Sequence, residues 1–338
     1  MEEFIKSQQW PVLLLILVGS LAVLGKAADW LVKEAVALSE RSGMPKFIIG
    51  ATIVSLGTTT PEVAVSVLAA LGGHPDLALG NAVGSIICDT GLILGVACLI
   101  APLQLPPSIV NRQGWVQLGS GFLLVALCWP WSDPLSAFTT GGTLAQWQGF
   151  VLVGLLGVYL WLSARWARAE GKTNAMLEDL EVDVRAPIPL VIVKLLAAVA
   201  LVVGASHILI PAAHTLAVRA FVPEAVIAAT LVAFGTSLPE FVTAVTAARH
   251  GHGDLAVGNI VGADILNVLF VAGLSAAATP AGLKADERFF VILFPTMLFV
   301  LIVFRVGIFM SGDRLKRPFG LVLLASYVLV TAISFAIR

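Results

Sequence analysis

Charged side chains are scarce in this sequence. Asp, Glu, Lys and Arg make up 12% of the 338 residues, whereas a soluble domain carries about 25%, so a typical water-soluble domain is excluded. The net charge of -1 at pH 7 argues against nucleic acid as a partner. The three cysteines, Cys88, Cys98 and Cys128, lie in apolar stretches without CxxC spacing. Neither a disulfide framework nor a zinc site is therefore predicted.

Apolar residues dominate instead, at 58% of the chain and a mean hydropathy of +0.96. The sequence contains ten apolar segments, and each is close to the roughly 20 residues that cross a bilayer. Their approximate bounds are 11–38, 47–71, 77–101, 114–131, 147–166, 188–217, 224–248, 255–278, 289–309 and 318–337. The first segment follows the acidic leader MEEFIK, which favours a spanning helix over a cleavable signal peptide.

One stretch occurs twice. The first copy runs from Gly50 to Gly95, and the second runs from Ala228 to Gly273, 178 positions later and without insertions. Seven polar, glycine and proline positions recur: Gly57, Thr58, Pro61, Glu62, Gly80, Asn81 and Gly84 reappear as Gly235, Thr236, Pro239, Glu240, Gly258, Asn259 and Gly262. Similarity between unrelated apolar helices would not repeat a Pro-Glu pair, so the sequence indicates a duplicated functional unit.

Each copy lies within a set of five apolar segments. Because five is odd, the two sets enter the membrane from opposite sides, and the repeats are inverted. The predicted fold is an all-α polytopic membrane protein of ten transmembrane helices. Its parts are a first five-helix repeat over 1–167 (motif 50–95), a polar linker over 168–187 and a second, inverted repeat over 188–338 (motif 228–273). Inverted repeats are typical of secondary transporters, whose substrate site lies near the midplane.

The distribution of Lys and Arg between the loops predicts the orientation. More of them fall on the side opposite the N-terminus than on the N-terminal side. By the positive-inside rule both termini then lie outside.

The motif GTTTPE combines a helix break with a carboxylate. Pro61 has no amide hydrogen, so the carbonyl of Gly57 loses its helical donor. Glu62 follows directly, and an ionisable side chain within the membrane usually marks an ion pathway. Thr58 and Thr59 lie on the same helical face as Glu62. The second copy supplies Thr236, Ser237 and Glu240.

The helix after each motif adds further oxygen ligands. Ser85 and Asp89 are spaced i,i+4, and their counterparts are Ala263 and Asn267. We expect Glu62, Asp89, Glu240 and Asn267 to form a central ring. Such oxygen-rich clusters suit hard cations such as Ca²⁺ or Na⁺, and protons are also possible occupants. Asp264 either lines this site or caps a neighbouring helix.

Other polar and small residues have structural interpretations. Small-residue pairs are expected to serve helix packing, namely Gly80 with Gly84, Gly258 with Gly262 and Gly91 with Gly95. Asp29 lies at helical spacings from Lys26 and Lys33, which favours a local ion pair. His207 occupies the position equivalent to Asp29 and is expected to be a hydrogen-bonded core residue.

At these motifs the sequence resembles the Ca²⁺:cation antiporter superfamily, most closely its prokaryotic sodium/calcium exchangers. The resemblance rests on GTTTPE with GNAVGSIICD and on GTSLPE with GNIVGADILN. It implies that Glu62 and Glu240 are the central Ca²⁺ ligands and also bind Na⁺. It also implies that the first, long helix of each repeat slides to open the site alternately. Further oxygens would come from Thr58, Thr59, Thr236, Ser237 and Ser85 and from backbone carbonyls near Ser55 and Ala233.

Two departures from the family pattern affect the site. The family places Asn in the first repeat and Asp in the second, whereas Asp89 and Asn267 exchange these types. Ala263 replaces the expected Ser, and Asp264 replaces an Asn. The lost hydroxyl removes a Na⁺ ligand, and the added acid favours protons or another cation, so the coupling ion stays open.

We therefore predict a secondary transporter in a prokaryotic plasma membrane that exchanges Ca²⁺ against Na⁺ by alternating access. Apart from the transported ions, no cofactor is predicted. An antiporter coupled to H⁺ or involving K⁺ is the alternative, since buried carboxylates also take up protons. A cation channel is a more distant one. An intramembrane enzyme is disfavoured because the chain contains neither HExxH nor GxSxG.

Overall fold

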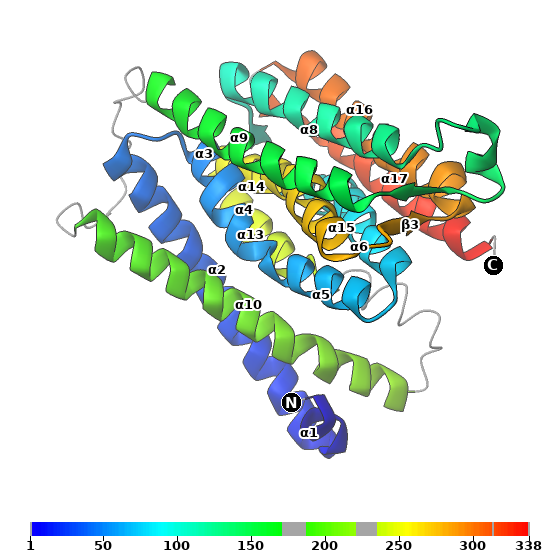
Figure 1. Ribbon diagram of the computed structural model, residues 1–338. Coiled ribbons are helices and arrows are strands. Elements are labelled where there is room, and N and C mark those ends of the chain that lie inside the picture. The colour runs from blue at the N-terminus through cyan, green and yellow to red at the C-terminus, as the bar shows by residue number, and fades with distance from the viewer. Residues whose placement is uncertain (1, 171–186, 221–234, 313, 337–338) are drawn as a thin grey trace.

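The computed structural model describes residues 2–170, 187–220, 235–312 and 314–336. Almost all of this part is helical, with α, π and 3-10 segments joined by short turns (Figure 1). The elements of the first half are α1 (Glu2–Ser7), α2 (Trp10–Ser42), α3 (Lys46–Ile49), π-helix η1 (Gly50–Val54), α4 (Ser55–Thr58), α5 (Thr60–Leu71), α6 (Pro75–Ile87), π-helix η2 (Cys88–Ile93), α7 (Leu94–Ile100), β1 (Leu103–Gln104), α8 (Pro107–Cys128), 3-10 helix η3 (Pro134–Phe138), β2 (Gly142–Leu144) and α9 (Gln146–Glu170). Those of the second half are α10 (Ile188–Arg219), α13 (Leu238–Arg249), α14 (Gly253–Leu266), π-helix η5 (Asn267–Ala272), α15 (Gly273–Ala278), β3 (Leu283–Ala285), π-helix η6 (Phe289–Leu293), α16 (Phe294–Ser311), β4 (Arg314–Leu315) and α17 (Arg317–Ala336).

Helices coincide with the predicted apolar segments, although the segment over 224–248 is described only from residue 235. Within the described residues, six helices are long and apolar enough to cross a membrane, or seven if the bent pair Lys46–Thr58 and Thr60–Leu71 is one span. Helix α8 is not among them, and it carries Gln113 and Gln117 in its interior. In α17 the apolar stretch covers only Arg317–Ile333. The chain is thus a helical, membrane-spanning protein.

The two longest helices, α2 and α10, contain 33 and 32 residues and pack along each other on one side of the bundle (Figure 1). They run in opposite directions. At one end of the pair the Arg219 guanidinium donates to the Gln8 carbonyl at 2.6 Å. The N-terminal end of α2 therefore lies beside the C-terminal end of α10.

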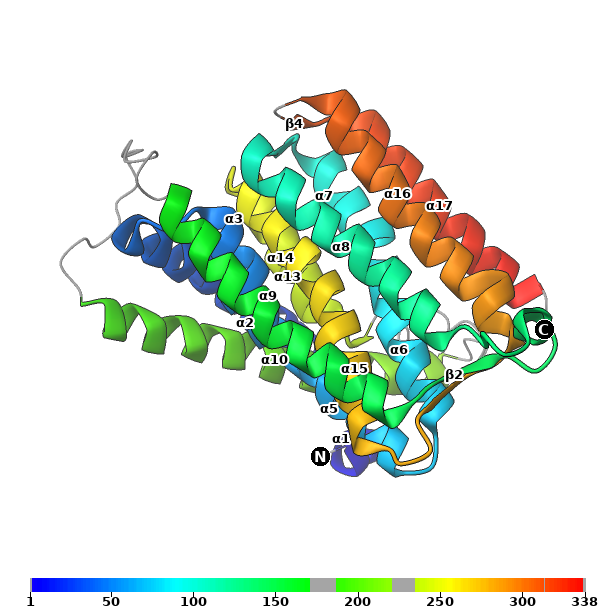
Figure 2. The same cartoon turned by 45° about the horizontal axis from the view of Figure 1, so that its top comes forward.

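The centre of the molecule consists of the helices that carry the repeated motif. The continuous stretches Pro75–Ile100 and Gly253–Ala278 are the most completely buried of the candidate spans, with 72% and 89% of their most apolar window buried. In α2, α9 and α10 the buried share of that window is 28–33%, and Figure 2 shows α9 and α10 on the outside of the bundle. The exposed apolar surface of the outer helices is what a lipid environment requires.

Glycines allow the central helices to approach closely. A Cβ atom on Gly258 would lie 2.2 Å from the Phe47 carbonyl oxygen, and one on Gly262 would lie 2.4 Å from that of Ala51. These distances exclude any side chain where α14 crosses α3 and η1. The predicted packing role of this glycine pair is confirmed. The same prediction was wrong for its repeat counterparts Gly80 and Gly84, since a Cβ on Gly84 would meet nothing within 4 Å and one on Gly80 would lie 3.9 Å from the Phe289 ring.

Two short antiparallel ladders connect the halves at their ends. Strand β1 pairs with β4, with Leu103 opposite Leu315, and β2 pairs with β3, with Thr143 opposite Lys284. Each ladder joins one strand from the first half of the chain to one from the second half.

The helices are interrupted at the motif. The axis bends by 44° between Lys46–Thr58 and Thr60–Leu71, at the predicted break before Pro61. Asp89 lies in η2, and its repeat counterpart Asn267 begins η5. Because π-helical turns inside α-helices are frequent at functional sites, both breaks direct attention to the same region.

Candidate cation-binding site

The two acidic residues of the repeated motif lie in the first turns of equivalent helices. Glu62 is in the first turn of α5 and Glu240 in that of α13, and each side chain is only 1% exposed. The Thr59 hydroxyl donates to Glu240 Oε1 at 3.1 Å, which links the first motif directly to the carboxylate of the second. The predicted approach of the two motifs is therefore realised.

The second pair of predicted ligands meets at the π-helical turns. Asn267 Nδ2 donates to Asp89 Oδ2 at 3.4 Å, and both side chains are buried. These residues are equivalent by the 178-residue repeat. Direct contact between equivalent residues is expected where a pseudo-two-fold axis passes between the repeats.

Several buried oxygens in this region have no hydrogen-bond partner in the described part of the chain. They are Glu62 Oε2, Glu240 Oε2, Asp89 Oδ1, Asn267 Oδ1, Asp264 Oδ1 and Ser237 Oγ. Buried polar groups are normally paired, because leaving them unpaired costs free energy. Five of these six atoms are carboxylate or amide oxygens, which can only accept. A bound cation would satisfy these acceptors, and a proton would satisfy a carboxylate.

No three Asp, Glu, His or Cys side chains converge as a metal site within the residues that the structure describes. A cation at this position therefore needs hydroxyl, amide or backbone oxygens as well as carboxylates. Ca²⁺ takes 6–8 oxygen ligands in flexible geometry, so a mixed ligand set agrees with its chemistry.

The predicted hydroxyl ligands are mostly buried around the same point. Thr58 donates to the Ser55 carbonyl at 3.5 Å, and that carbonyl also accepts the Thr59 amide at 2.8 Å. Ser85 is 3% exposed on α6. Thr236 is half-buried and donates to Asn81 Oδ1 at 3.4 Å. Ala233, whose carbonyl was predicted to contribute, lies outside the described residues.

Asp264 is held toward α8 and is not a helix cap. Its Oδ2 accepts the Thr90 hydroxyl and also Gln117 Nε2, the latter at 2.5 Å, while its Oδ1 is one of the unpaired oxygens. Sequence reasoning missed both donors. Gln117 was detectable as one of the polar residues in the interior of α8, but its pairing with Asp264, like that of Thr90, was not.

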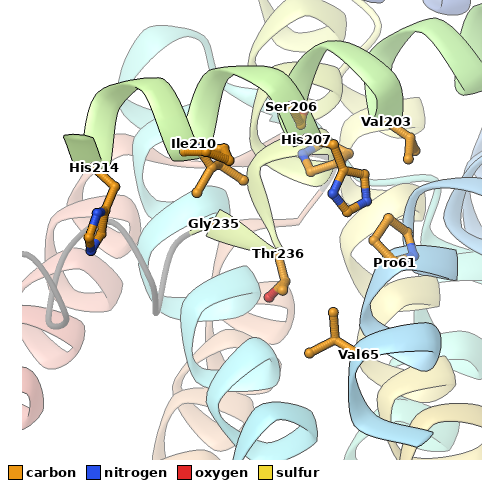
Figure 3. A pocket seen from close by; sticks show the side chains of 11 residues that line it. Pro61, Val65, Val203, Ser206, His207, Ile210, His214, Gly235 and Thr236 are labelled. Atoms are coloured by element: carbon orange, nitrogen blue, oxygen red, sulfur yellow. The ribbon is translucent and has the colours of Figure 1, made fainter. Parts of the chain in front are cut away.

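A cavity of about 330 Å³ lies between α10 and the two Pro-Glu turns (Figure 3). Pro61 and Val65 line it from α5, and Gly235, Thr236 and Pro239 line it from the second motif. On the α10 side it is lined by Val203, Ser206, His207, Ile210, Pro211 and His214. The cavity therefore reaches residues that directly precede Glu62 and Glu240.

Two predictions about polar residues on the long helices were wrong. His207 is not a core residue, since its side chain is exposed and lines this cavity. Asp29 pairs with His250 Nε2 at 3.0 Å rather than with the lysines on its own helix. The end of α13 approaches α2 here, and a tertiary contact replaces the local one.

The sequence matches the sodium/calcium exchanger protein family over residues 12–165 and 190–336. The chain belongs to this family. Relatives of the exchanger include inner membrane protein YrbG of Escherichia coli, 33% identical and covering 95% of this chain and 96% of the relative. The sodium/calcium exchanger MaX1 of Methanosarcina acetivorans is 29% identical over 96% of this chain and 98% of its own length.

A solved structure of the sodium-calcium exchanger NCX_Mj superimposes on this exchanger with a TM-score of 0.77. It covers 95% of this chain and 98% of its own length, at 24% identity. The putative antiporter CaxA of Alkalimonas amylolytica is 29% identical over 93% of this chain and 95% of its own length. The exchanger is therefore an integral membrane protein of a cation antiporter family, and its fold is that of NCX_Mj.

Proposed function

We propose that this exchanger moves Ca²⁺ against Na⁺ by alternating access at one site formed by both repeats. The observation that carries the proposal is the contact between the two motifs, in which Thr59 donates to Glu240 among carboxylate and amide oxygens that lack partners. Two relatives are named sodium/calcium exchangers, which agrees with these ions. In this proposal the protein binds the transported ions and needs no cofactor.

The proposed ligands come from both halves of the chain. Glu62 and Glu240 bind Ca²⁺ centrally, and Asp89 and Asn267 complete the ring. Hydroxyls of Thr58, Thr59, Thr236, Ser237 and Ser85 and carbonyls near Ser55 and Ala233 add oxygens. Na⁺ and Ca²⁺ require the same carboxylates, so each ion displaces the other. Exchange follows because the bare acidic cluster is too costly to enclose in a dry site.

The proposed architecture is ten spans in two inverted five-helix repeats, 1–167 and 188–338, with a linker over 168–187. The contact between the repeat-equivalent residues Asp89 and Asn267 supports a pseudo-two-fold axis at the site. Both termini lie outside in this arrangement, since the Lys and Arg residues then concentrate in the cytoplasm.

The test is Ca²⁺ flux in proteoliposomes under separately imposed Na⁺, K⁺ and pH gradients. An outward Na⁺ gradient is expected to drive ⁴⁵Ca²⁺ uptake against its own gradient, and E62Q and E240Q are expected to abolish it. Uphill uptake that persists in both variants would refute the shared site. Ca²⁺ flux that no gradient can drive uphill would indicate a channel.

Proton coupling is the second candidate, and Asp264 is the observation that favours it. This acid lies beside the central ring with one unpaired oxygen, and the neighbouring position is Ala263, which offers no hydroxyl. Ca²⁺ uptake driven by a pH gradient in the absence of Na⁺ would support this coupling, and uptake that requires Na⁺ would exclude it.

A further inference from the structure

The π-helix η1 contains a carbonyl that loses its helical donor. The Ser55 amide donates to the Gly50 carbonyl, five residues earlier, because this turn is π-helical. In an α-helix the same amide would donate to the carbonyl four residues earlier, which belongs to Ala51. The π-helical turn therefore takes the Ser55 amide away from the Ala51 carbonyl.

Helix α9 supplies another donor to this carbonyl. The Tyr159 hydroxyl donates to the Ala51 carbonyl at 3.1 Å, and the Tyr159 side chain is buried. One turn further along α9, the Ser163 hydroxyl accepts Gln113 Nε2 of α8 at 3.1 Å, and both of these side chains are fully buried. Tyr159 is thus held by a helix that is itself bonded to its neighbour.

The Ala51 carbonyl also lies in close contact with α14. A Cβ atom on Gly262 would lie 2.4 Å from its oxygen and 2.6 Å from the Ser55 hydroxyl oxygen. Ala51 and Ser55 are both fully buried. An unpaired carbonyl at such a place costs free energy, since lipid cannot bond it and buried backbone groups are normally paired. The Tyr159 hydroxyl therefore stabilises the π-helical register against the α-helical one, in which Ala51 would recover its own donor.

The register of η1 determines how the first motif faces the site. Successive residues differ by about 100° around a helix axis, so a change of register by one residue would rotate α4 relative to α3 by about this angle. The Ser55 carbonyl accepts the Thr59 amide at 2.8 Å, and the Thr59 hydroxyl donates to Glu240 at 3.1 Å. These contacts connect the π-helical turn to the carboxylate of the second motif.

We propose that Tyr159 is a positioning residue for the cation site. Its hydroxyl keeps η1 in the π-helical register, which directs the Ser55 carbonyl and the hydroxyls of Thr58 and Thr59 toward the bound ion. The inference rests on the proposed function, because it requires cations to bind between the two motifs. It gives α9, which carries none of the proposed ligands, a role in ion affinity.

The experiment compares Y159F with the wild-type protein in proteoliposomes, by the Ca²⁺ concentration for half-maximal ⁴⁵Ca²⁺ uptake. Loss of one hydrogen bond between neutral groups changes an equilibrium constant by about threefold to tenfold. Y159F is expected to raise the half-maximal concentration by about this factor and to keep the maximal rate within about twofold. A merely structural role would lower the maximal rate, because less protein folds, and would leave the half-maximal concentration unchanged.

Amide hydrogen exchange gives a second readout that does not depend on transport. In Y159F the amides of residues 50–59 should exchange faster than in the wild-type protein, whereas those of α14 should keep their rates. S326A is the matched control, since Ser326 is also a buried hydroxyl of an outer helix but donates to the Val322 carbonyl of its own helix. S326A should change neither the half-maximal concentration nor the exchange of residues 50–59.

A variant with 4-aminophenylalanine at position 159 keeps the ring and returns an N–H donor, which is weaker than the phenol. Its half-maximal concentration is expected between those of the wild type and Y159F. This variant tests the proposal even if Y159F does not fold, and a value equal to that of the wild type would then overturn it.

A half-maximal concentration in Y159F equal to that of the wild type, or exchange that increases uniformly over the protein, would overturn the role of Tyr159 and leave the exchanger intact. Absence of Ca²⁺ uptake by the wild-type protein under every imposed cation gradient would overturn both proposals.

Discussion

At the scale of single residues, the site is defined by buried oxygens that the protein itself does not satisfy. Glu62 and Glu240 are each 1% exposed, and each keeps one oxygen without a partner among the described residues. In the described part of the chain, the donors to these carboxylates are hydroxyls and an amide, not Lys or Arg. The protein therefore supplies acceptors in excess of donors, which is the electrostatic condition for binding a cation.

Removing either central charge should abolish transport. E62Q and E240Q keep the shape of the side chain but remove its negative charge. Removing one partner of a buried ion pair costs about 3 kcal/mol or more. Ca²⁺ uptake should therefore fall by about 100-fold or more. The measurement is ⁴⁵Ca²⁺ uptake in proteoliposomes. E40Q, which changes an exposed glutamate of α2, is the control and should transport normally. Uptake by E62Q within a few fold of the control would contradict the assignment.

Adjacent threonines provide a sharper comparison. Thr59 donates to Glu240, whereas Thr60 is exposed and donates to the Leu56 carbonyl of its own helix. A hydrogen bond to a charged group contributes about 1.5–3 kcal/mol, so T59A should raise the Ca²⁺ concentration for half-maximal uptake by about 10- to 100-fold. T60A should leave it unchanged. Equal behaviour of the two variants would exclude Thr59 from the site.

The sequence predicted the central acids because they recur, and it failed where a partner came from elsewhere. The repeat alone pairs Glu62 with Glu240 and Asp89 with Asn267. Nothing in it couples Thr90 or Gln117 to Asp264, or directs the Tyr159 hydroxyl of α9 to the Ala51 carbonyl at 3.1 Å. Those contacts depend on how α8 and α9 pack on the centre. The predicted local ion pair of Asp29 was wrong for the same reason, since its partner His250 is 221 positions away.

At the scale of elements, composition predicted the helices, and the motif predicted their interruptions. Pro61 gives a 44° bend because it cannot donate to the preceding turn. The π-helical turns η2 and η5 were not predictable, because they contain no proline and look like ordinary apolar helix. They occur at equivalent positions, which identifies them as part of the duplicated unit.

Close packing of α14 on the bent helix is also testable. G258A would place a methyl group 2.2 Å from the Phe47 carbonyl oxygen, and such overpacking typically costs about 1–3 kcal/mol. The midpoint of thermal unfolding in detergent should fall. G154A on α9 is the control, because nothing lies within 4 Å of its added Cβ, and alanine is the better helix former. A midpoint for G258A at or above that of G154A would contradict this packing.

At the scale of the whole molecule, the two halves differ at equivalent positions. Val65 lines the cavity beside α10 and is 43% exposed, whereas its repeat counterpart Thr243 on α13 is fully buried. The asymmetry between equivalent positions is what an exchanger open to one side should have. The cavity is lined by the C-terminal half of α10, which lies beside the N-terminal end of α2. The open path is therefore on that side.

Equivalent cysteines should report this asymmetry. V65C should react with a membrane-impermeant thiol reagent from the N-terminal side, and T243C should react from the opposite side only when the other state is populated. The native cysteines Cys88, Cys98 and Cys128 are buried and serve as the unreactive background. Labelling of both variants from the same side would contradict inverted repeats.

The central claim is that Na⁺ and Ca²⁺ compete for one site built by both halves of the chain. Isothermal titration of the purified protein with Ca²⁺ at increasing Na⁺ concentrations tests it most directly. The account predicts that Na⁺ raises the apparent Kd for Ca²⁺ without changing the number of sites, and that E62Q and E240Q each remove the binding. Ca²⁺ binding that is indifferent to Na⁺, or that survives in both variants, would contradict it.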